Sequence, residues 1–280
     1  MNQHFTQELQ VTIAAAQQAS QIILSVYEQD FEVERKAGNE PVTQADRQAN
    51  TLLVQRLSEA FPSDGIVAEE SVPSPQDLAE QVARERVWFV DPLDGTKEFI
   101  ARNGEFSTMI GLTVRGRPVL GVVAQPAFGI IAVGVVGQGA WLLEPDGTKT
   151  PLRVSEHKRV NACTVIVSRS HLSAPLQKIV KALAPAARIS CGSVGVKATR
   201  IAQRQADVYV NPHQPGGAKL WDGCAPDAIV VAAGGKTSDL SGRDLDYSTT
   251  TLELVGGFVA TNGHLHDEVL ATARRVWEEG

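Results

Sequence analysis

The stretch VWFVDPLDGTKEFI (residues 87–100) begins as an apolar strand and ends in two carboxylates, Asp91 and Asp94. The residues VWFV are typical of a buried strand. A turn at its end requires only the Asp94–Gly95 step, so a turn does not explain Asp91 or the threonine and lysine that follow. Because ligand sites in α/β folds form at the carboxyl ends of strands, this stretch predicts a functional site at a strand terminus.

Length, composition and charge narrow the class of protein. The chain of 280 residues, with 43% hydrophobic and 21% charged residues, is long enough for one large core or two modest ones. It holds 26 Lys and Arg residues against 32 Asp and Glu residues, a formal charge of −6. This balance argues against a nucleic-acid polymer or an anionic membrane surface as partner.

Targeting and cysteine patterns predict a cytoplasmic protein. The N-terminus lacks the features of a signal peptide, and the most apolar run, residues 119–136, is interrupted by polar residues, proline and glycine. No membrane span is therefore expected. The three cysteines are far apart and odd in number, so they predict buried thiols in a reducing compartment rather than disulfides or a metal site.

Two patterns of periodicity divide the chain. In the first half, helices are expected at 5–29, 43–60 and 74–86, and strands at 31–36 and 65–71. Residues 107–145 then have the rhythm of an antiparallel meander. Past residue 155, strands alternate with helices; the strands are expected at 163–170, 206–210 and 257–262, and the helices at 175–184, 194–205, 224–235 and 267–279. This alternation predicts a layered α/β protein of two packed subdomains, residues 1–155 and 156–280.

Several acidic residues need an explanation, namely Asp46, Glu69, Glu70, Asp91, Asp94 and Asp222. Taken singly, each has an ordinary role in a capping box, a turn or a helix N-cap. If they converge in an apolar surround, however, they repel one another unless a cation neutralises them. Oxygen ligands without His or Cys favour Mg²⁺ over Zn²⁺, and protein-bound Mg²⁺ commonly completes its shell with phosphate oxygens. Together these residues predict a metal-assisted phosphate site.

Four strings carry a resemblance to a known family, VTQAD, AEES, DPLDGTKEF and WDGCAPDAIVVAAGG, in this order and spacing. The chain resembles the inositol monophosphatase superfamily of Mg²⁺-dependent, Li⁺-sensitive phosphatases over nearly its whole length. The form DGTKEF is similar to the CysQ-like 3'(2'),5'-bisphosphate nucleotidase branch. The resemblance implies an alternating α/β/α/β/α sandwich of two subdomains.

The resemblance also implies roles for individual residues. Two or three Mg²⁺ ions are expected, one held by Glu69, Asp91 and the carbonyl of Leu93, and another by Asp91, Asp94 and Asp222. Asp46 and Thr96 would orient and deprotonate the attacking water, and the backbone amides of Gly95 and Thr96, with Asp222, would contact the substrate.

Two further segments, VSRSH (167–171) and CGSVGVKATR (191–200), resemble those that meet the nucleotide in this branch. The matching positions are Ser168, His171, Ser193 and Lys197. The alternative interpretation is structural: His171 would be a hydrogen-bonded loop residue, and Lys197 would lie on the solvated face of a helix. Their chemistry suits a second phosphate, since Lys acts as a point charge toward phosphate.

The resemblance implies a phosphatase that removes the 3'-phosphate of adenosine 3',5'-bisphosphate, linked to sulfate assimilation. Alternatives are a phosphatase for inositol 1-phosphate or fructose 1,6-bisphosphate, or a regulator that binds metal or nucleotide without turnover. The partner expected is a small phosphorylated molecule, and a homodimer is possible.

Overall fold

The computed structural model describes residues 5–35 and 41–278. Across these residues the strands form a seven-stranded sheet in the order β3-β4-β5-β6-β7-β8-β9, a five-stranded sheet in the order β11-β10-β12-β14-β13, and a small β1-β2 pair. The strands are β1 Glu34–Arg35, β2 Pro41–Val42, β3 Gly65–Ala68, β4 Arg86–Asp94, β5 Ser107–Val114, β6 Arg117–Gln125, β7 Ile130–Val135, β8 Gly139–Leu143, β9 Lys149–Leu152, β10 Thr164–Ser168, β11 Ala187–Cys191, β12 Val208–Asn211, β13 Lys236–Ser238 and β14 Phe258–Thr261.

The helices lie between and outside the two sheets. They are α1 Thr6–Tyr27, α2 Gln44–Ala60, α3 Pro75–Val82, α4 Thr96–Ile100, α5 Ala174–Leu183, α6 Val194–Ala202, α7 Leu220–Ala232 and α8 His266–Glu278, with short 3-10 turns η1 Glu69–Ser71, η2 Pro126–Phe128 and η3 Val160–Ala162. No helix in the part of the chain that the structure describes is long and apolar enough to cross a membrane.

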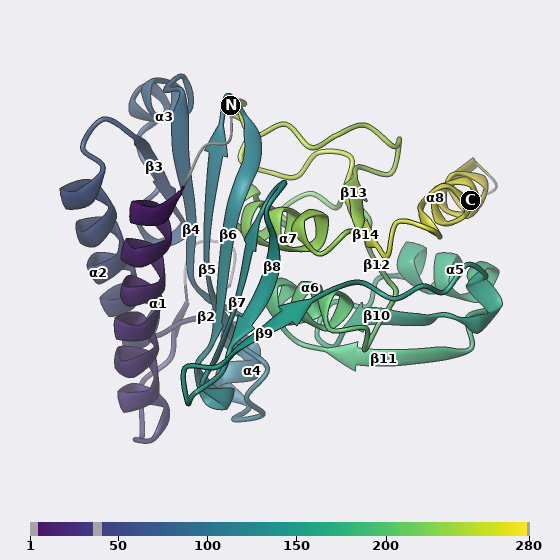
Figure 1. Cartoon of the computed structure of the whole chain (residues 1–280), viewed down its shortest axis with the longest axis horizontal. Coiled ribbons are helices and arrows are strands. Elements are labelled where there is room, and N and C mark those ends of the chain that lie inside the picture. Colours follow the sequence, from purple (N-terminus) through teal and green to yellow (C-terminus); the bar gives the residue numbers. More distant parts are fainter. Residues whose placement is uncertain (1–4, 36–40, 279–280) are drawn as a thin grey trace.

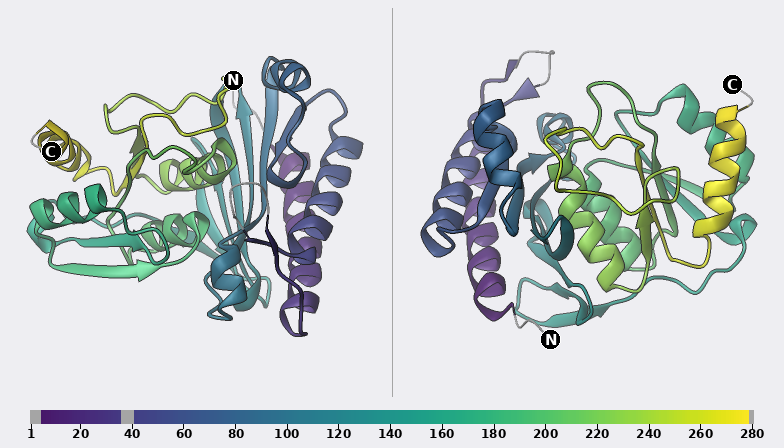
Figure 2. Two further views of the ribbon diagram at one scale, coloured as in Figure 1. Left: turned by 180° about the vertical axis from the view of Figure 1, so that it is seen from behind. Right: turned by 90° about the horizontal axis from the view of Figure 1, so that it is seen from above.

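The elements stack in five layers (Figures 1 and 2). Helices α1 and α2 cover one face of the seven-stranded sheet, α6 and α7 lie between the two sheets, and α5 and α8 cover the outer face of the five-stranded sheet. The expected α/β/α/β/α sandwich is confirmed. The chain passes from the first sheet to the second between Leu152 and Thr164.

Strand β4 shows why the opening stretch is apolar throughout. Val87 and Phe89 pack in the core between the two sheets, whereas Trp88 and Val90 pack in the core under α1 and α2. Successive side chains of a strand point to opposite faces, and a strand buried on both faces therefore has a continuous apolar sequence.

A row of three glycines lets α7 lie close against the seven-stranded sheet. Gly111, Gly121 and Gly134 are cross-strand partners on β5, β6 and β7. A Cβ atom built on them would lie 2.5, 2.3 and 2.6 Å, respectively, from atoms of α7, closer than atoms can approach. The row therefore fixes the depth at which α7 packs, and α7 carries Asp222 in its first turn. We call these three residues the glycine row.

Most of the expected elements are present. The antiparallel meander is confirmed and runs from β4 to β9. Of the strand expected at 31–36, only β1 forms among the described residues, and the break expected after it falls largely on residues 36–40, outside the described residues. Strand β11 was not expected, because it lies at the sheet edge and is largely exposed and polar. Helix α7 begins at Leu220 rather than at 224, so Asp222 lies inside the helix and is not its N-cap.

Candidate metal and phosphate site

Three carboxylates from two elements meet at the end of β4. The regular pairing of β4 with β5 is interrupted between Asp91 and Asp94, and such an irregularity re-aims side chains. The backbone N–H of Leu93 donates to Asp91 Oδ1 at 2.9 Å, which stabilises the turned chain. Asp222 reaches the same place from α7, and one oxygen of each carboxylate lies within 4.8 Å of the others. We call Asp91, Asp94 and Asp222 the site cluster.

The electrostatics of the site cluster suit a cation. Burial raises the pKa of Asp91 well above its usual value, and the charges of Glu69, Asp94 and Asp222 raise it further. Burial, followed by the charges of Asp94 and Glu69, raises the pKa of Asp222 to about 8. Among the described residues, no ion pair involves a member of the site cluster. Clustered carboxylate oxygens with uncompensated charge fit a hard divalent metal ion.

Two further predicted ligands lie beside the site cluster. Glu69 opens the turn η1 directly after β3 and lines the same cavity, where its side chain interacts with Asp91. The side chain of Leu93 is buried, and its carbonyl accepts a hydrogen bond from Thr96 Oγ1 at 3.3 Å. The parallel pairing of β3 with β4 brings these residues to one edge of the sheet.

Asp46 and Thr96, fifty residues apart, are also brought together. Asp46 closes a capping box with Thr43 at the start of α2, so its ordinary role is confirmed. The same carboxylate accepts a hydrogen bond from Thr96 Oγ1 at 3.2 Å. Burial raises the pKa of Asp46, although its hydrogen bonds with Thr43 oppose this effect.

The turn between the site cluster and Thr96 depends on Gly95. Its φ of +92° is in the left-handed region, which costs a residue with a Cβ atom roughly 1–2 kcal/mol. A Cβ atom there would also lie 3.1 Å from the carbonyl oxygen of Glu105. Helix α4 begins immediately afterwards at Thr96.

The structure places Ser193 against Asp94. Ser193 Oγ donates to Asp94 Oδ2 at 2.5 Å, and the backbone N–H groups of Val194 and Gly195 donate to the same oxygen. The start of α6 thereby holds Asp94 in place. Ser193 has φ +42° and caps α6 through Val196 N–H.

The other three predicted substrate residues, Ser168, His171 and Lys197, line a cavity of about 660 Å³ whose walls also include the site cluster. Lys197 is only 2% exposed, so its reading as a solvated helix residue is wrong. Its Nζ donates to the carbonyl of Gly192 at 3.1 Å and lies 5.2 Å from the ring centroid of Tyr209. Burial lowers the pKa of Lys197.

The sequence assigns no role to part of the cavity wall, although the loop 213–221 is expected near the rim of the site. Lys97 and Glu98 line it, as do Tyr209 and the segment from Gln214 to Lys219. The letters K and E of DGTKEF were a signal for the first two, because this form of the motif carries the resemblance to the CysQ-like branch. The segment 214–219 carries no comparable signal, since its glycines and prolines are compatible with any loop.

Comparison with known proteins identifies the class. The model of the inositol monophosphatase family matches residues 5–278, and the chain belongs to this family. The structure is similar to the IMPase of Thermotoga maritima, with a TM-score of 0.80, 26% identity and coverage of 97% of this chain and 98% of that chain.

Particular relatives lie in one branch of the family. The chain is 35% identical over 245 residues to the 3'(2'),5'-bisphosphate nucleotidase CysQ of Escherichia coli (strain K12), covering 87% of this chain and 95% of that protein. It is 29% identical over 269 residues to the 3'(2'),5'-bisphosphate nucleotidase 1 of Dictyostelium discoideum, covering 85% and 86%. The resemblance inferred from the sequence is confirmed.

Proposed function

We propose that this protein is a Mg²⁺-dependent phosphomonoesterase that removes the 3'-phosphate of adenosine 3',5'-bisphosphate, giving AMP and phosphate. The names of its relatives support this reaction. The single observation that carries it is that one cavity is lined both by the site cluster and by Ser168, His171 and Lys197. A substrate with two phosphates has one group for the carboxylates with their metal and one for these three donors.

The metal ligands in this proposal are oxygen atoms only. Glu69, Asp91 and the carbonyl of Leu93 would hold one ion, and Asp91, Asp94 and Asp222 a second, with Asp91 shared. The donor set favours Mg²⁺. When bound, such ions neutralise phosphate charge and make water more acidic.

The chain's own residues orient the attacking water. The Thr96 hydroxyl donates a hydrogen bond to the Asp46 carboxylate. Its oxygen can then accept a hydrogen bond from the attacking water. The raised pKa of Asp46 makes this carboxylate a better proton acceptor than an exposed aspartate. The pair therefore aligns water and receives its proton, while the backbone amides of Gly95 and Thr96 contact the transferred phosphate.

The other three predicted lining residues hold the rest of the substrate. The hydroxyl of Ser168, the imidazole of His171 and the ammonium of Lys197 supply donors for the second phosphate. Lys197 already donates to the carbonyls of Gly192 and Cys191, and an ammonium has three N–H groups. It therefore has one donor left for a ligand in the cavity.

The test is phosphate release with Mg²⁺, then without it, then with added Li⁺. The substrates are adenosine 3',5'-bisphosphate, its 3'-phospho-5'-phosphosulfate relative, inositol 1-phosphate and fructose 1,6-bisphosphate. We expect Mg²⁺-dependent turnover with preference for the two nucleotides. Preference for inositol or fructose phosphates would contradict the substrate assignment, and metal binding without any turnover would contradict the enzyme assignment.

A further inference from the structure

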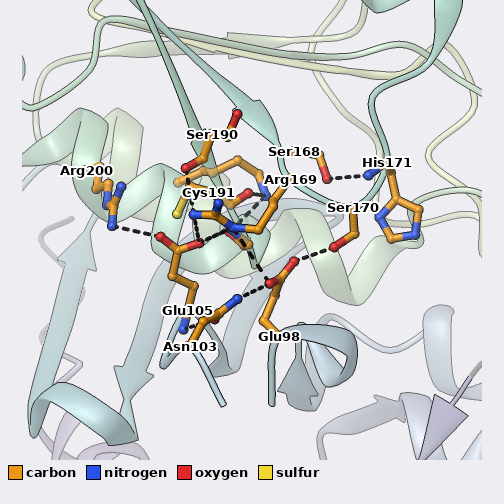
Figure 3. Close-up of polar contacts among 12 residues, drawn as sticks. Glu98, Asn103, Glu105, Ser168, Arg169, Ser170, His171, Ser190, Cys191 and Arg200 are labelled. Atoms are coloured by element: carbon orange, nitrogen blue, oxygen red, sulfur yellow. Dashed lines mark hydrogen bonds and ion pairs between the residues drawn. The ribbon is translucent and has the colours of Figure 1, made fainter. Parts of the chain in front are cut away.

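Two side chains shortly after Asp94 contact a segment from the second half of the chain. Lys97 and Glu98 lie in α4, and residues 168–171 begin with the last residue of β10. Lys97 Nζ lies 2.8 Å from His171 Nε2, and Ser170 Oγ donates to Glu98 Oε1 (Figure 3). We call residues 168–171 the docked segment.

Glu98 is held firmly for this contact. The residue is 4% exposed, and its second carboxylate oxygen accepts a hydrogen bond from the Asn103 amide (Figure 3). Gly192 packs directly over it, since a Cβ atom at Gly192 would lie 2.3 Å from Glu98 Cγ. Because the side chain is enclosed, its other oxygen, Oε1, faces Ser170 in one fixed direction.

The docked segment is attached at three successive residues. Arg169 donates to Glu105 Oε2 at 3.0 and 2.8 Å, Ser170 donates to Glu98, and His171 meets Lys97. All three partners come from residues 97–105. Within the segment, the His171 backbone N–H donates to Ser168 Oγ at 3.1 Å. The strand pairing of β10 with β11 places the backbone of Ser168, and this hydrogen bond ties its side chain to the same attachments.

The contact with Lys97 also determines the protonation of His171. An ammonium only donates hydrogen bonds, so Nε2 of His171 accepts and the imidazole proton sits on Nδ1. Burial lowers the pKa of His171, and the charges of Lys97 and Lys197 lower it further, while Asp94 and Glu98 act in the opposite direction. At neutral pH the ring is therefore an uncharged donor.

We propose that Lys97 and Glu98 are positioning residues for substrate selection, which hold the docked segment so that Ser168 and His171 meet the second phosphate of the substrate. Lys97 and Glu98 thus connect the turn that follows Asp94 to the docked segment. This inference rests on the proposed function. It predicts that changes at residues 97, 98 and 170 affect recognition of the second phosphate more than the chemical step.

The first test compares two substrates that differ only in the 5'-phosphate, adenosine 3',5'-bisphosphate and adenosine 3'-phosphate. In Ser170→Ala and Glu98→Gln we expect KM for the bisphosphate to rise about tenfold with kcat little changed, and the kinetics with the monophosphate to stay within about twofold. The double variant should match the single variants, because Ser170→Ala removes the Ser170–Glu98 hydrogen bond, Glu98→Gln replaces its charged acceptor by a weaker neutral one, and both changes act on this one contact.

Ser173→Ala is the matched control. Ser173 lies just beyond the docked segment and caps α5 through Leu176 N–H, with no contact to α4 among the described interactions. It should leave KM for both substrates unchanged. Equal KM changes for the two substrates in Ser170→Ala, or unchanged KM in both Ser170→Ala and Glu98→Gln, would overturn the inference. Ser170 is exposed, so its variant remains informative if Glu98→Gln fails to fold.

The second test needs no turnover. Titration of the His171 ring protons by NMR should show a higher pKa in Lys97→Met than in the wild type, and Lys97→Arg should restore most of the difference. An unchanged His171 pKa in Lys97→Met would overturn the contact. A wild-type protein that does not cleave the bisphosphate would overturn the proposed function, whereas wild-type cleavage with unaffected variants would overturn this inference alone.

Discussion

Two clusters of acidic side chains lie on either side of the Gly192–Val194 segment, and they are neutralised in different ways. The site cluster forms no ion pair among the described residues. The second cluster, Glu98 and Glu105, which we call the paired cluster, is surrounded by donors. Glu105 pairs with Arg169 at 2.8 Å and Arg200 at 3.4 Å and accepts the Gly192 N–H.

The difference appears in the pKa values. Burial and mutual repulsion raise the pKa of Asp91 and Asp222. Burial also raises the pKa of Glu105, but the hydrogen bonds from Gly192 and Arg169 outweigh it and lower the value overall. One cluster therefore has its cations within the chain, whereas the other has no such partner among the described residues and suits a cation from solution. Burial alone does not distinguish a structural acid from a metal ligand.

The largest expected effect is that of Asp94→Asn in the site cluster. We expect activity to fall by about 1,000-fold or more, since a lost metal ligand removes several kcal/mol of transition-state stabilisation. Without metal, the variant should be as stable as the wild type or more stable. The asparagine oxygen still accepts the hydrogen bond from Ser193, and the loss of the negative charge relieves repulsion within the site cluster. Phosphate release and urea unfolding measure the two effects. An active Asp94→Asn protein would show that Asp94 is only a turn residue and not a metal ligand.

The next largest effect is expected from Mg²⁺ binding, which should stabilise the fold through the site cluster alone. Saturation of the wild type with Mg²⁺ at about 100 times its Kd should stabilise the fold by about 2.7 kcal/mol. The same Mg²⁺ should leave the melting temperature of Asp94→Asn nearly unchanged. Thermal unfolding with EDTA and with Mg²⁺ measures this. A Mg²⁺ response retained in Asp94→Asn would show that the ion binds elsewhere.

In the paired cluster, Glu105→Gln should have the opposite profile to Asp94→Asn. Loss of the charge leaves Arg169 and Arg200 with a poorer acceptor, so we expect a loss of about 2 kcal/mol in the free energy of unfolding. The response to Mg²⁺ should remain. Urea unfolding measures the loss, and a variant as stable as the wild type would show that the paired cluster does not stabilise the fold.

The pH dependence of stability without metal follows from Asp222. Its carboxyl has a pKa of about 8 in the folded protein against an ordinary value of 3.8, so the folded state binds the proton more tightly. Stability should therefore fall as pH rises from 6 to 8, by at most about 1.4 kcal/mol per pH unit. Mg²⁺ should abolish this slope. A metal-free protein equally stable at both pH values would contradict the raised pKa.

The smallest effects are expected at Ser193, which lies between the two clusters. Ser193→Ala removes the cap of α6 and a hydrogen bond to Asp94, so we expect a loss of about 1 kcal/mol. Ser193→Gly should cost only a few tenths of a kcal/mol, because glycine tolerates the positive φ at this position. The midpoints of urea unfolding show which of the two variants is more stable. A Ser193→Ala protein more stable than Ser193→Gly would contradict this prediction.

Much of the fold was predictable because its signals are local. The buried strand at 87–90 and the meander after it follow from apolar alternation. Strand β11 was missed because its exposed edge position gives it no apolar pattern. The start of α7 was missed because Lys219 is an unusual N-cap, and Asp222 in its first turn stabilises the helix by accepting the Lys219 backbone N–H.

The convergence of the site was harder to predict than its composition. The carboxylates were identified from DPLDG and WDG, and the structure brings Asp91, Asp94 and Asp222 together. The contacts of Lys97 and Glu98 with the docked segment span more than seventy residues of sequence. No local pattern encodes such a contact, since it depends on how the two sheets pack.

The glycine row has a consequence for genetics. Asp222 reaches the site only because α7 packs so closely against β5, β6 and β7, and any side chain at Gly111, Gly121 or Gly134 would push that helix outward. A collection of inactive mutants should therefore include changes along this row, although none of the three glycines lines the cavity. Selection on catalysis thus acts on a stripe of the sheet that no substrate touches.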